Sequence, residues 1–264
     1  MQTMPREGVL HGQLAVVTGG GRGIGAVIAD ALGAAGARVA VLGRDRDELK
    51  ARARALTDQY GVEATFMACD VADEDAVARA FAGIRQTMGD PSILVNNAGQ
   101  SAGVAFADTT RETWDRMIGV NLTGTFLCTR EVLPAMLRAG AGRVVNIAST
   151  AGLKGYSHTA AYCAAKHGVV GLTRALAMET AKRGVTVNAV CPGYTDTGMA
   201  ASAIQNLVDA GRTEDEARKA ITRVMPIGRL IQPGEVASAV LWLCSPGAGA
   251  VTGQSIAVAG GEVT

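Results

Sequence analysis

The sequence predicts an α/β protein: a single domain built on a doubly wound sheet of seven parallel strands, with helices on both faces. Short β-branched runs alternate along the chain with helical stretches, which is the pattern of βαβ units. Most of these runs are apolar throughout, as strands covered on both faces are. No linker or shift in composition divides the 264 residues, and one α/β domain can have this length.

Seven runs have the length and composition of buried strands. They are rich in valine, isoleucine and alanine and carry few charges, which suits a covered sheet. In chain order the predicted strands are residues 14–18, 38–43, 64–68, 92–98, 143–148, 185–191 and 254–260.

Helical stretches fill most of the intervals between these runs. Pro233 suits the first turn of the last stretch, where its missing N–H costs no hydrogen bond. The predicted helical stretches are residues 23–36, 46–61, 73–89, 110–140, 158–184 and 232–246.

Residues 198–226 interrupt the alternation. They follow the sixth predicted strand, contain no strand-like run and are charged at their middle, GRTEDEARK. In open α/β sheets, ligands bind beyond the carboxyl ends of the strands. We therefore expect residues 198–226 to form a mobile substrate lid over that crevice; the alternative is a solvated helical excursion without a role.

Composition argues against several functional classes. The formal net charge is +1 with no run of like charges, which indicates neither nucleic acid nor an anionic membrane as a partner. No apolar run reaches the length of a membrane span, and the N-terminal stretch MQTMPREGVLHGQ lacks the apolar core of a signal peptide. Five cysteines without a C-x-x-C pair are typical of buried, reduced thiols in a cytoplasmic protein. The three histidines form no metal-binding spacing, so no metal is expected.

A glycine-rich turn, TGGGRGIG, joins the first strand to the first helix. It departs from G-x-G-x-x-G, because Gly19, Gly23 and Gly25 are separated by three residues and then by one. The physical requirement is the same: glycines let the backbone approach a pyrophosphate, and the helix start offers free N–H groups and its positive dipole end. Because the turn follows the first strand of a βαβ unit, nucleotide binding is favoured over a plain turn.

The tip of the second strand lacks the carboxylate with which NAD enzymes commonly hold the ribose hydroxyls. The strand ends at Gly43, and Arg44 follows. A guanidinium binds a 2′-phosphate well, and Arg22 in the glycine turn is placed to help. The two arginines favour NADP. The carboxylate of Asp45, next to Arg44, keeps NAD as the alternative.

The stretch AAYCAAKHG places a phenol and an ammonium four residues apart among alanines. Alanines favour a helix, on which Tyr162 and Lys166 share one face. A nearby cation favours the phenolate, so we expect Lys166 to lower the pKa of Tyr162 and make it a usable acid at neutral pH. Taken alone, such a pair is more commonly part of a solvated helix.

Five motifs in order set this pair in context: TGGGRGIG, NNAG, NIAS, YCAAK and NAVCPG. With this order and spacing, the chain resembles the short-chain dehydrogenase/reductase family from about Leu10 to its end. The resemblance implies a Rossmann-type fold, NAD(P)-dependent interconversion of a ketone and a secondary alcohol, and a homo-oligomer, in this family a tetramer. Residues 114–138 and 159–183 carry apolar side chains on more than one face, so we expect them to mediate self-association.

The resemblance also implies a catalytic tetrad. Tyr162 is the acid/base that donates a proton to the carbonyl oxygen, and Lys166 lowers its pKa and holds the nicotinamide ribose. Ser149 hydrogen-bonds the substrate oxygen, and Asn121 in VNLTG supports a proton-relay water by kinking its helix. This agrees with the need for a donor where charge develops on a ketone oxygen.

The same resemblance implies cofactor contacts at the glycine turn, at the ends of the following strands and at two of the tetrad residues. The expected cofactor-binding residues are Gly19, Gly21, Arg22, Gly23, Ile24, Gly25, Arg44, Asp70, Val71, Asn97, Ala98, Gly99, Tyr162, Lys166, Pro192, Gly193, Thr195 and Thr197.

Three short sequence motifs narrow the expected class of substrate. NIASTAG, VNAVCPGYTDTGMA and MPIGRLIQPGEVA are similar to β-ketoacyl reductases and to aromatic polyketide ketoreductases. The latter tend to carry Pro-Gly-Gly shortly after NNAG, where this chain reads QSAG. We expect NADPH-dependent reduction of a β-keto thioester, on CoA or a carrier protein, or of a similar ketone. The alternatives are a degradative NAD-dependent secondary alcohol or 3-hydroxyacyl dehydrogenase and, in a different class, a non-catalytic nucleotide-sensing protein.

Overall fold

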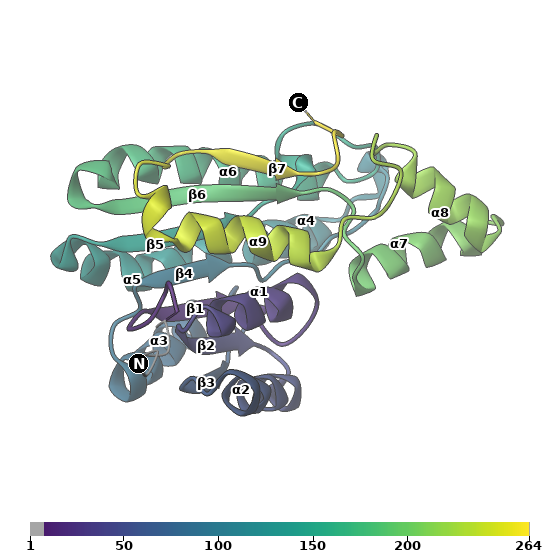
Figure 1. Ribbon diagram of the computed structural model, residues 1–264. Coiled ribbons are helices and arrows are strands. Elements are labelled where there is room, and N and C mark those ends of the chain that lie inside the picture. Colours follow the sequence, from purple (N-terminus) through teal and green to yellow (C-terminus); the bar gives the residue numbers. More distant parts are fainter. Residues whose placement is uncertain (1–7, 264) are drawn as a thin grey trace.

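A single parallel sheet organises the computed structural model, which describes residues 8–263 (Figure 1). Residues 1–7, part of the N-terminal stretch considered above, and Thr264 lie outside the described residues. The strand order is β3-β2-β1-β4-β5-β6-β7, so the predicted doubly wound seven-stranded sheet is confirmed. The strands are β1 Leu14–Thr18, β2 Arg38–Gly43, β3 Ala64–Ala68, β4 Ile93–Asn96, β5 Gly142–Ile147, β6 Val185–Pro192 and β7 Ser255–Val258.

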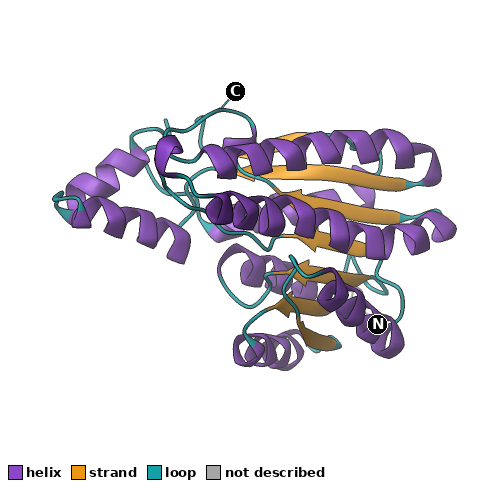
Figure 2. Ribbon diagram, turned by 180° about the vertical axis from the view of Figure 1, so that it is seen from behind, coloured by secondary structure: helices purple, strands orange, loops and turns teal. Residues whose placement is uncertain are grey.

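Helices cover both faces of the sheet (Figure 2). Alternate residues of β1 serve opposite faces, because side chains in a strand alternate: Ala15 and Val17 pack with α1, α2 and α9, and Leu14 and Val16 with α3 and α5. The helices are α1 Gly23–Ala34, α2 Arg46–Tyr60, α3 Glu74–Met88, α4 Arg111–Ile118, α5 Gly124–Ala139, α6 Ala160–Thr180, α7 Gly198–Asp209, α8 Glu214–Thr222 and α9 Pro233–Cys244.

The predicted helical stretch 110–140 is divided in the structure. A π-helical segment, Gly119–Thr123, separates α4 from α5. At its centre the buried Asn121 donates from Nδ2 to the Met117 carbonyl oxygen at 3.0 Å. Side chains that enter the backbone ladder are one cause of helix distortion, and π-bulges are frequent at functional sites. The kink implied at Asn121 thus takes the form of a π-bulge.

The insertion at residues 198–226 is helical. It forms α7 and α8, which follow β6 and project from the carboxyl end of the sheet (Figure 1). The start of α8 is stabilised by a capping box between Thr213 and Glu216. Helices of the α/β body thus surround the sheet, while this pair stands outside it.

Two further findings bear on the setting of the protein. All five cysteines are free thiols, and all except Cys163 are buried. Across residues 8–263, no helix is both long enough and apolar enough to span a membrane.

Candidate active site

The glycine turn after β1 has the geometry that a phosphate cradle needs. Gly19 and Gly23 adopt φ values of +63° and +56°, a region that favours glycine. Gly25 packs directly on the Gly19 carbonyl, so a side chain there would collide with the backbone. No side chain caps the start of α1 at Arg22, which leaves the N–H groups of its first turn available to an anion. The turn fits a dinucleotide pyrophosphate.

Asn97 ties this turn to the end of β4. Its Nδ2 donates to the carbonyl oxygens of Thr18 and Gly19, at 2.9 Å and 3.1 Å. In return, the Thr18 hydroxyl accepts from the backbone N–H groups of Asn97 and Ala98, each at 3.0 Å. The two segments meet where the strand order reverses, between β1 and β4, which is the usual ligand crevice of such sheets. Thr18 is absent from the predicted set; its only signal is a polar residue at the end of an apolar strand.

The tip of β2 presents an arginine next to an aspartate that caps a helix. Arg44 is exposed, and the neighbouring Asp45 uses its carboxylate to cap α2, accepting from Asp47 N and Glu48 N at 3.0 Å each. One carboxylate oxygen of Asp45, Oδ1, is therefore occupied by the helix cap. Arg22 forms a loose ion pair of 3.7 Å with Glu48, an acid that the sequence argument did not single out.

Asp70 and Val71 lie beside this tip, because Cys69 N donates to the Gly43 carbonyl oxygen at 2.7 Å. The Asp70 carboxylate accepts from Ala72 N at 3.0 Å, which shapes its own turn. Val71 is buried. Both residues thus lie beside the tip of β2, at the carboxyl edge of the sheet where the resemblance implies cofactor contacts.

The side chains of the predicted tetrad converge beyond β4 and β5. Ser149 lies near enough to the Tyr162 hydroxyl for its side chain to lower the pKa of that phenol. Lys166 lies with Nζ 5.7 Å from the centre of the Tyr162 ring. A Cβ on Gly99 would stand 2.9 Å from Asn121 Oδ1 and 3.6 Å from Lys166 Nζ, so the NNAG segment lies close to both side chains.

The expectation that Lys166 lowers the pKa of Tyr162 is wrong for the protein in this structure. Burial raises the pKa of Tyr162 to about 12, against a smaller lowering by its hydrogen bond with Ser149. Burial also lowers the pKa of Lys166 to about 8. Desolvation disfavours both charged forms. The ammonium of Lys166 donates to the Ile147 carbonyl oxygen at 2.8 Å.

Asn121 has its amide engaged by the protein on both sides. Nδ2 donates to the Gln100 carbonyl oxygen at 2.9 Å, and Oδ1 accepts from Gln100 N at 3.2 Å. This reciprocal pair fixes the segment after NNAG above the π-bulge. Gln100 contributes backbone atoms alone, so its residue type gives no signal for this contact.

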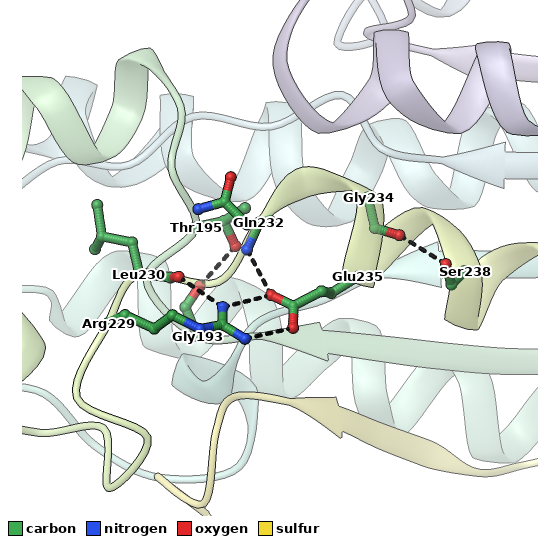
Figure 3. Close-up of polar contacts among 8 residues, drawn as sticks. All are labelled: Gly193, Thr195, Arg229, Leu230, Gln232, Gly234, Glu235 and Ser238. Atoms are coloured by element: carbon green, nitrogen blue, oxygen red, sulfur yellow. Dashed lines mark hydrogen bonds and ion pairs between the residues drawn. The ribbon is translucent and has the colours of Figure 1, made fainter.

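The segment after β6 is braced at the base of the α7–α8 insertion (Figure 3). Thr195 forms a parallel bridge with Ile231, and its hydroxyl donates to the Gly193 carbonyl oxygen at 3.0 Å. Arg229 donates to both carboxylate oxygens of Glu235 at 2.8 Å, which with the Gln232 N–H lowers the pKa of Glu235 to about 2. The bridge joins the segment that enters the α7–α8 insertion to the segment that leaves it.

Thr197 extends this segment back to the glycine turn. A Cβ placed on Gly23 would lie 3.8 Å from the Thr197 methyl carbon. Pro192, the last residue of β6, is buried. Most of the expected residues from the glycine turn to Thr197 therefore lie at or just beyond the carboxyl ends of the strands, and their cofactor contacts stay predictions.

Comparisons with known proteins agree with this arrangement. The family model described as enoyl-(acyl carrier protein) reductase matches residues 19–262. An acetoacetyl-CoA reductase of Rhizobium meliloti (strain 1021) is 41% identical, over 95% of this chain and 98% of its own length. The 3-oxoacyl-(acyl-carrier-protein) reductase FabG of Aquifex aeolicus (strain VF5) is 38% identical, over 96% and 98%. A crystal structure of an actinorhodin polyketide ketoreductase variant with NADPH has a TM-score of 0.91 and 45% identity, covering 95% of this chain and 97% of that one.

Proposed function

We propose that this chain, which belongs to the short-chain dehydrogenase/reductase family, reduces a β-keto thioester or a similar ketone with NADPH. It is an oxidoreductase that interconverts a ketone and a secondary alcohol. One observation carries the proposal: Ser149, Tyr162 and Lys166 converge beside a glycine turn that fits a dinucleotide. The relatives named for acetoacetyl-CoA and 3-oxoacyl substrates support the substrate class.

The chemistry divides between cofactor and protein. When bound, the nicotinamide supplies the hydride. The hydroxyls of Ser149 and Tyr162 hydrogen-bond the ketone oxygen and stabilise the negative charge that grows there. Tyr162 then gives up its proton. A pKa of about 12 keeps that proton on the phenol at neutral pH, which suits a donor in the reductive direction. Lys166, charged below a pKa of about 8, stabilises the phenolate left behind.

The cofactor choice follows from the tip of β2. Arg44 and Arg22 are placed to hold a 2′-phosphate, and Asp45 is occupied by its helix cap. The NADPH in the solved ketoreductase supports the same choice. The remaining cofactor contacts are those predicted above, from Gly19 to Thr197.

Three features of the setting belong to the proposal. We assign α7 and α8 as the substrate lid, because they project from the crevice end of the sheet and carry the exposed Met199 at their start. We assign self-association, as a tetramer, to the predicted stretches, which expose Trp114, Phe126 and Met178. The five free thiols support a reducing, cytoplasmic setting.

A substrate screen tests the function. Oxidation of NADPH and of NADH is followed with acetoacetyl-CoA, simple diketones and cyclic ketones, and secondary alcohols are tested in the reverse direction. Crotonyl-CoA is included, because the matching family model bears an enoyl reductase description. We expect NADPH oxidation with acetoacetyl-CoA and none with crotonyl-CoA; turnover confined to the enoyl thioester, or to NAD with alcohols, contradicts the proposal.

A further inference from the structure

A buried carboxylate near the end of the chain has no place in the predicted site. The side chain of Glu262 is 0% exposed, and a buried charge needs partners to offset its desolvation. Its Oε1 lies 3.2 Å from Lys154 Nζ and accepts a hydrogen bond from the hydroxyl of Tyr156. Lys154 also donates to the Glu262 backbone carbonyl oxygen at 3.4 Å.

Both partners belong to the segment that joins two members of the tetrad. Lys154 and Tyr156 lie between Ser149 and Tyr162. The Tyr156 hydroxyl is 2.6 Å from the hydroxyl of Thr150, and Thr150 is buried and directly follows Ser149. Because a carboxylate only accepts, the proton of Tyr156 goes to Glu262. A hydrogen-bonded path therefore runs from Glu262 through Tyr156 to Thr150, the residue after Ser149.

The other carboxylate oxygen faces the segment after β6. A Cβ on Gly193 would stand 2.9 Å from Glu262 Oε2, and Oε2 has no hydrogen-bond partner in the described part of the chain. Gly193 N donates to the Val258 carbonyl oxygen at 3.1 Å, and Glu262 N donates to that of Ala259 at 3.1 Å. The turn after β7 thus seats the carboxylate against Gly193.

We propose that Glu262 is a positioning residue: its carboxylate joins the 150–156 segment to Gly193 and so sets Ser149 against the nicotinamide side of the crevice. The inference rests on the proposed function, in which Ser149 binds the ketone oxygen. Lys154 supplies the charge that lets the carboxylate stay buried, and Tyr156 transmits its position to Thr150. A side chain at Gly193 would bring its Cβ to 2.9 Å from the carboxylate and 3.2 Å from the Ala259 Cα, so the carboxylate would have to shift.

Two variants separate positioning from simple stability. Glu262→Gln keeps the size and removes the charge, which leaves Lys154 unpaired and can unfold the protein. Tyr156→Phe keeps the Lys154–Glu262 ion pair and removes only the hydroxyl that reaches Thr150. Glu63→Gln is the matched control, because Glu63 pairs with Arg38 at 3.5 Å and precedes β3 at the opposite end of the sheet.

We expect Tyr156→Phe, and Glu262→Gln where it folds, to lower kcat for the ketone about tenfold, within what a displacement of 1 Å can cost. The Kd of NADPH should stay within about twofold, since the pyrophosphate and 2′-phosphate contacts are untouched. The double variant should be no slower than Glu262→Gln alone, because both act through one path. A kcat within twofold of wild type in both variants would overturn the proposal.

Hydrogen exchange of the free protein provides a readout independent of turnover. Amides of residues 150–157 should exchange faster in Tyr156→Phe than in Glu63→Gln; equal rates overturn the link. Failure of the proposed function looks different: wild type then reduces no ketone, and the positioning role falls with it. If the wild type reduces the ketone and the Tyr156→Phe and Glu262→Gln variants match it, only the positioning role of Glu262 is overturned.

Discussion

The ammonium of Lys166 donates a 2.8 Å hydrogen bond to the carbonyl oxygen of Ile147, the last residue of β5. Lys166 is 4% exposed, and burial lowers its pKa to about 8. This single contact fixes a cation beneath the site while leaving its charge close to the point of loss at physiological pH. We therefore expect the activity to be sensitive to mild alkali.

The first prediction concerns that sensitivity. The folded pKa of Lys166 lies below its ordinary 10.5, so its charge is present below about pH 8 and is lost as the pH rises through that value. We expect kcat/KM for ketone reduction to fall above an apparent pKa near 8, as the ammonium of Lys166 loses its charge. Lys166→Arg, which keeps its charge at all these pH values, should lose the descending limb. A profile of the wild type that is flat to pH 9.5 contradicts this assignment.

Tyr162→Phe should abolish most turnover. The ring still packs, but the proton donor is gone, and loss of a general acid costs about 10²–10⁴-fold. NADPH binding, measured by fluorescence titration, should change little. Tyr60→Phe, at the end of α2, is the matched control and should behave as wild type; a Tyr162→Phe rate above about a tenth of wild type rules out the acid role.

Cofactor preference should follow Arg44. A charge-assisted bond to the 2′-phosphate contributes about 1.5–3 kcal/mol, or roughly 10- to 150-fold. Arg44→Ala should therefore lower kcat/KM for NADPH by that factor and leave the NADH value nearly unchanged. Arg54→Ala, an exposed arginine of α2 paired with Asp58, serves as the control.

Gly43→Asp should shift the preference toward NADH. A Cβ at Gly43 meets its nearest neighbour, Leu49, at an ordinary 3.4 Å, so the substitution fits. The new carboxylate repels the 2′-phosphate and offers acceptors to the ribose hydroxyls. If wild type already prefers NADH, the role given to Arg44 is wrong.

The lid prediction has a defined boundary. Residues 198–226 should exchange amide hydrogens more slowly in a ternary complex than in the free protein, because lids order when substrate closes the site. Residues 193–197 and 229–232 should exchange slowly in both, since the Thr195–Ile231 bridge and the Arg229–Glu235 pair hold them. Equally slow exchange of residues 198–226 in the two samples would mean that α7 and α8 are rigid.

Self-association is tested by mass. Light scattering at micromolar concentration should give a tetramer. Phe126, which is 45% exposed on α5, should be part of the contact, so Phe126→Asp should reduce the mass. Val9→Asp replaces an apolar residue of similar exposure, 56%, outside the predicted stretches and should leave the mass unchanged. A monomeric wild type refutes the assignment.

The strands and helices could be predicted from the sequence because each depends on the pattern of a short run of residues. The apolar run 38–43 is β2, and the helix predicted from residue 46 begins there as α2. The same holds for the glycine turn, because the positive φ values that it needs occur at glycines, Gly19 and Gly23. The site motifs also lie at strand ends, and parallel strands bring their carboxyl ends to one edge whatever the loops do between them.

Only the tertiary structure decided the environment of these groups. The sign of the Tyr162 pKa shift depends on burial by packed neighbours, which the spacing of Tyr162 and Lys166 does not report. Asp45 adjoins Arg44 in the sequence, yet its carboxylate turns into the helix cap. Glu262 meets Tyr156 across 106 residues of chain. A contact of that range has no local pattern, since it exists only once β6, β7 and the 150–156 segment are packed together.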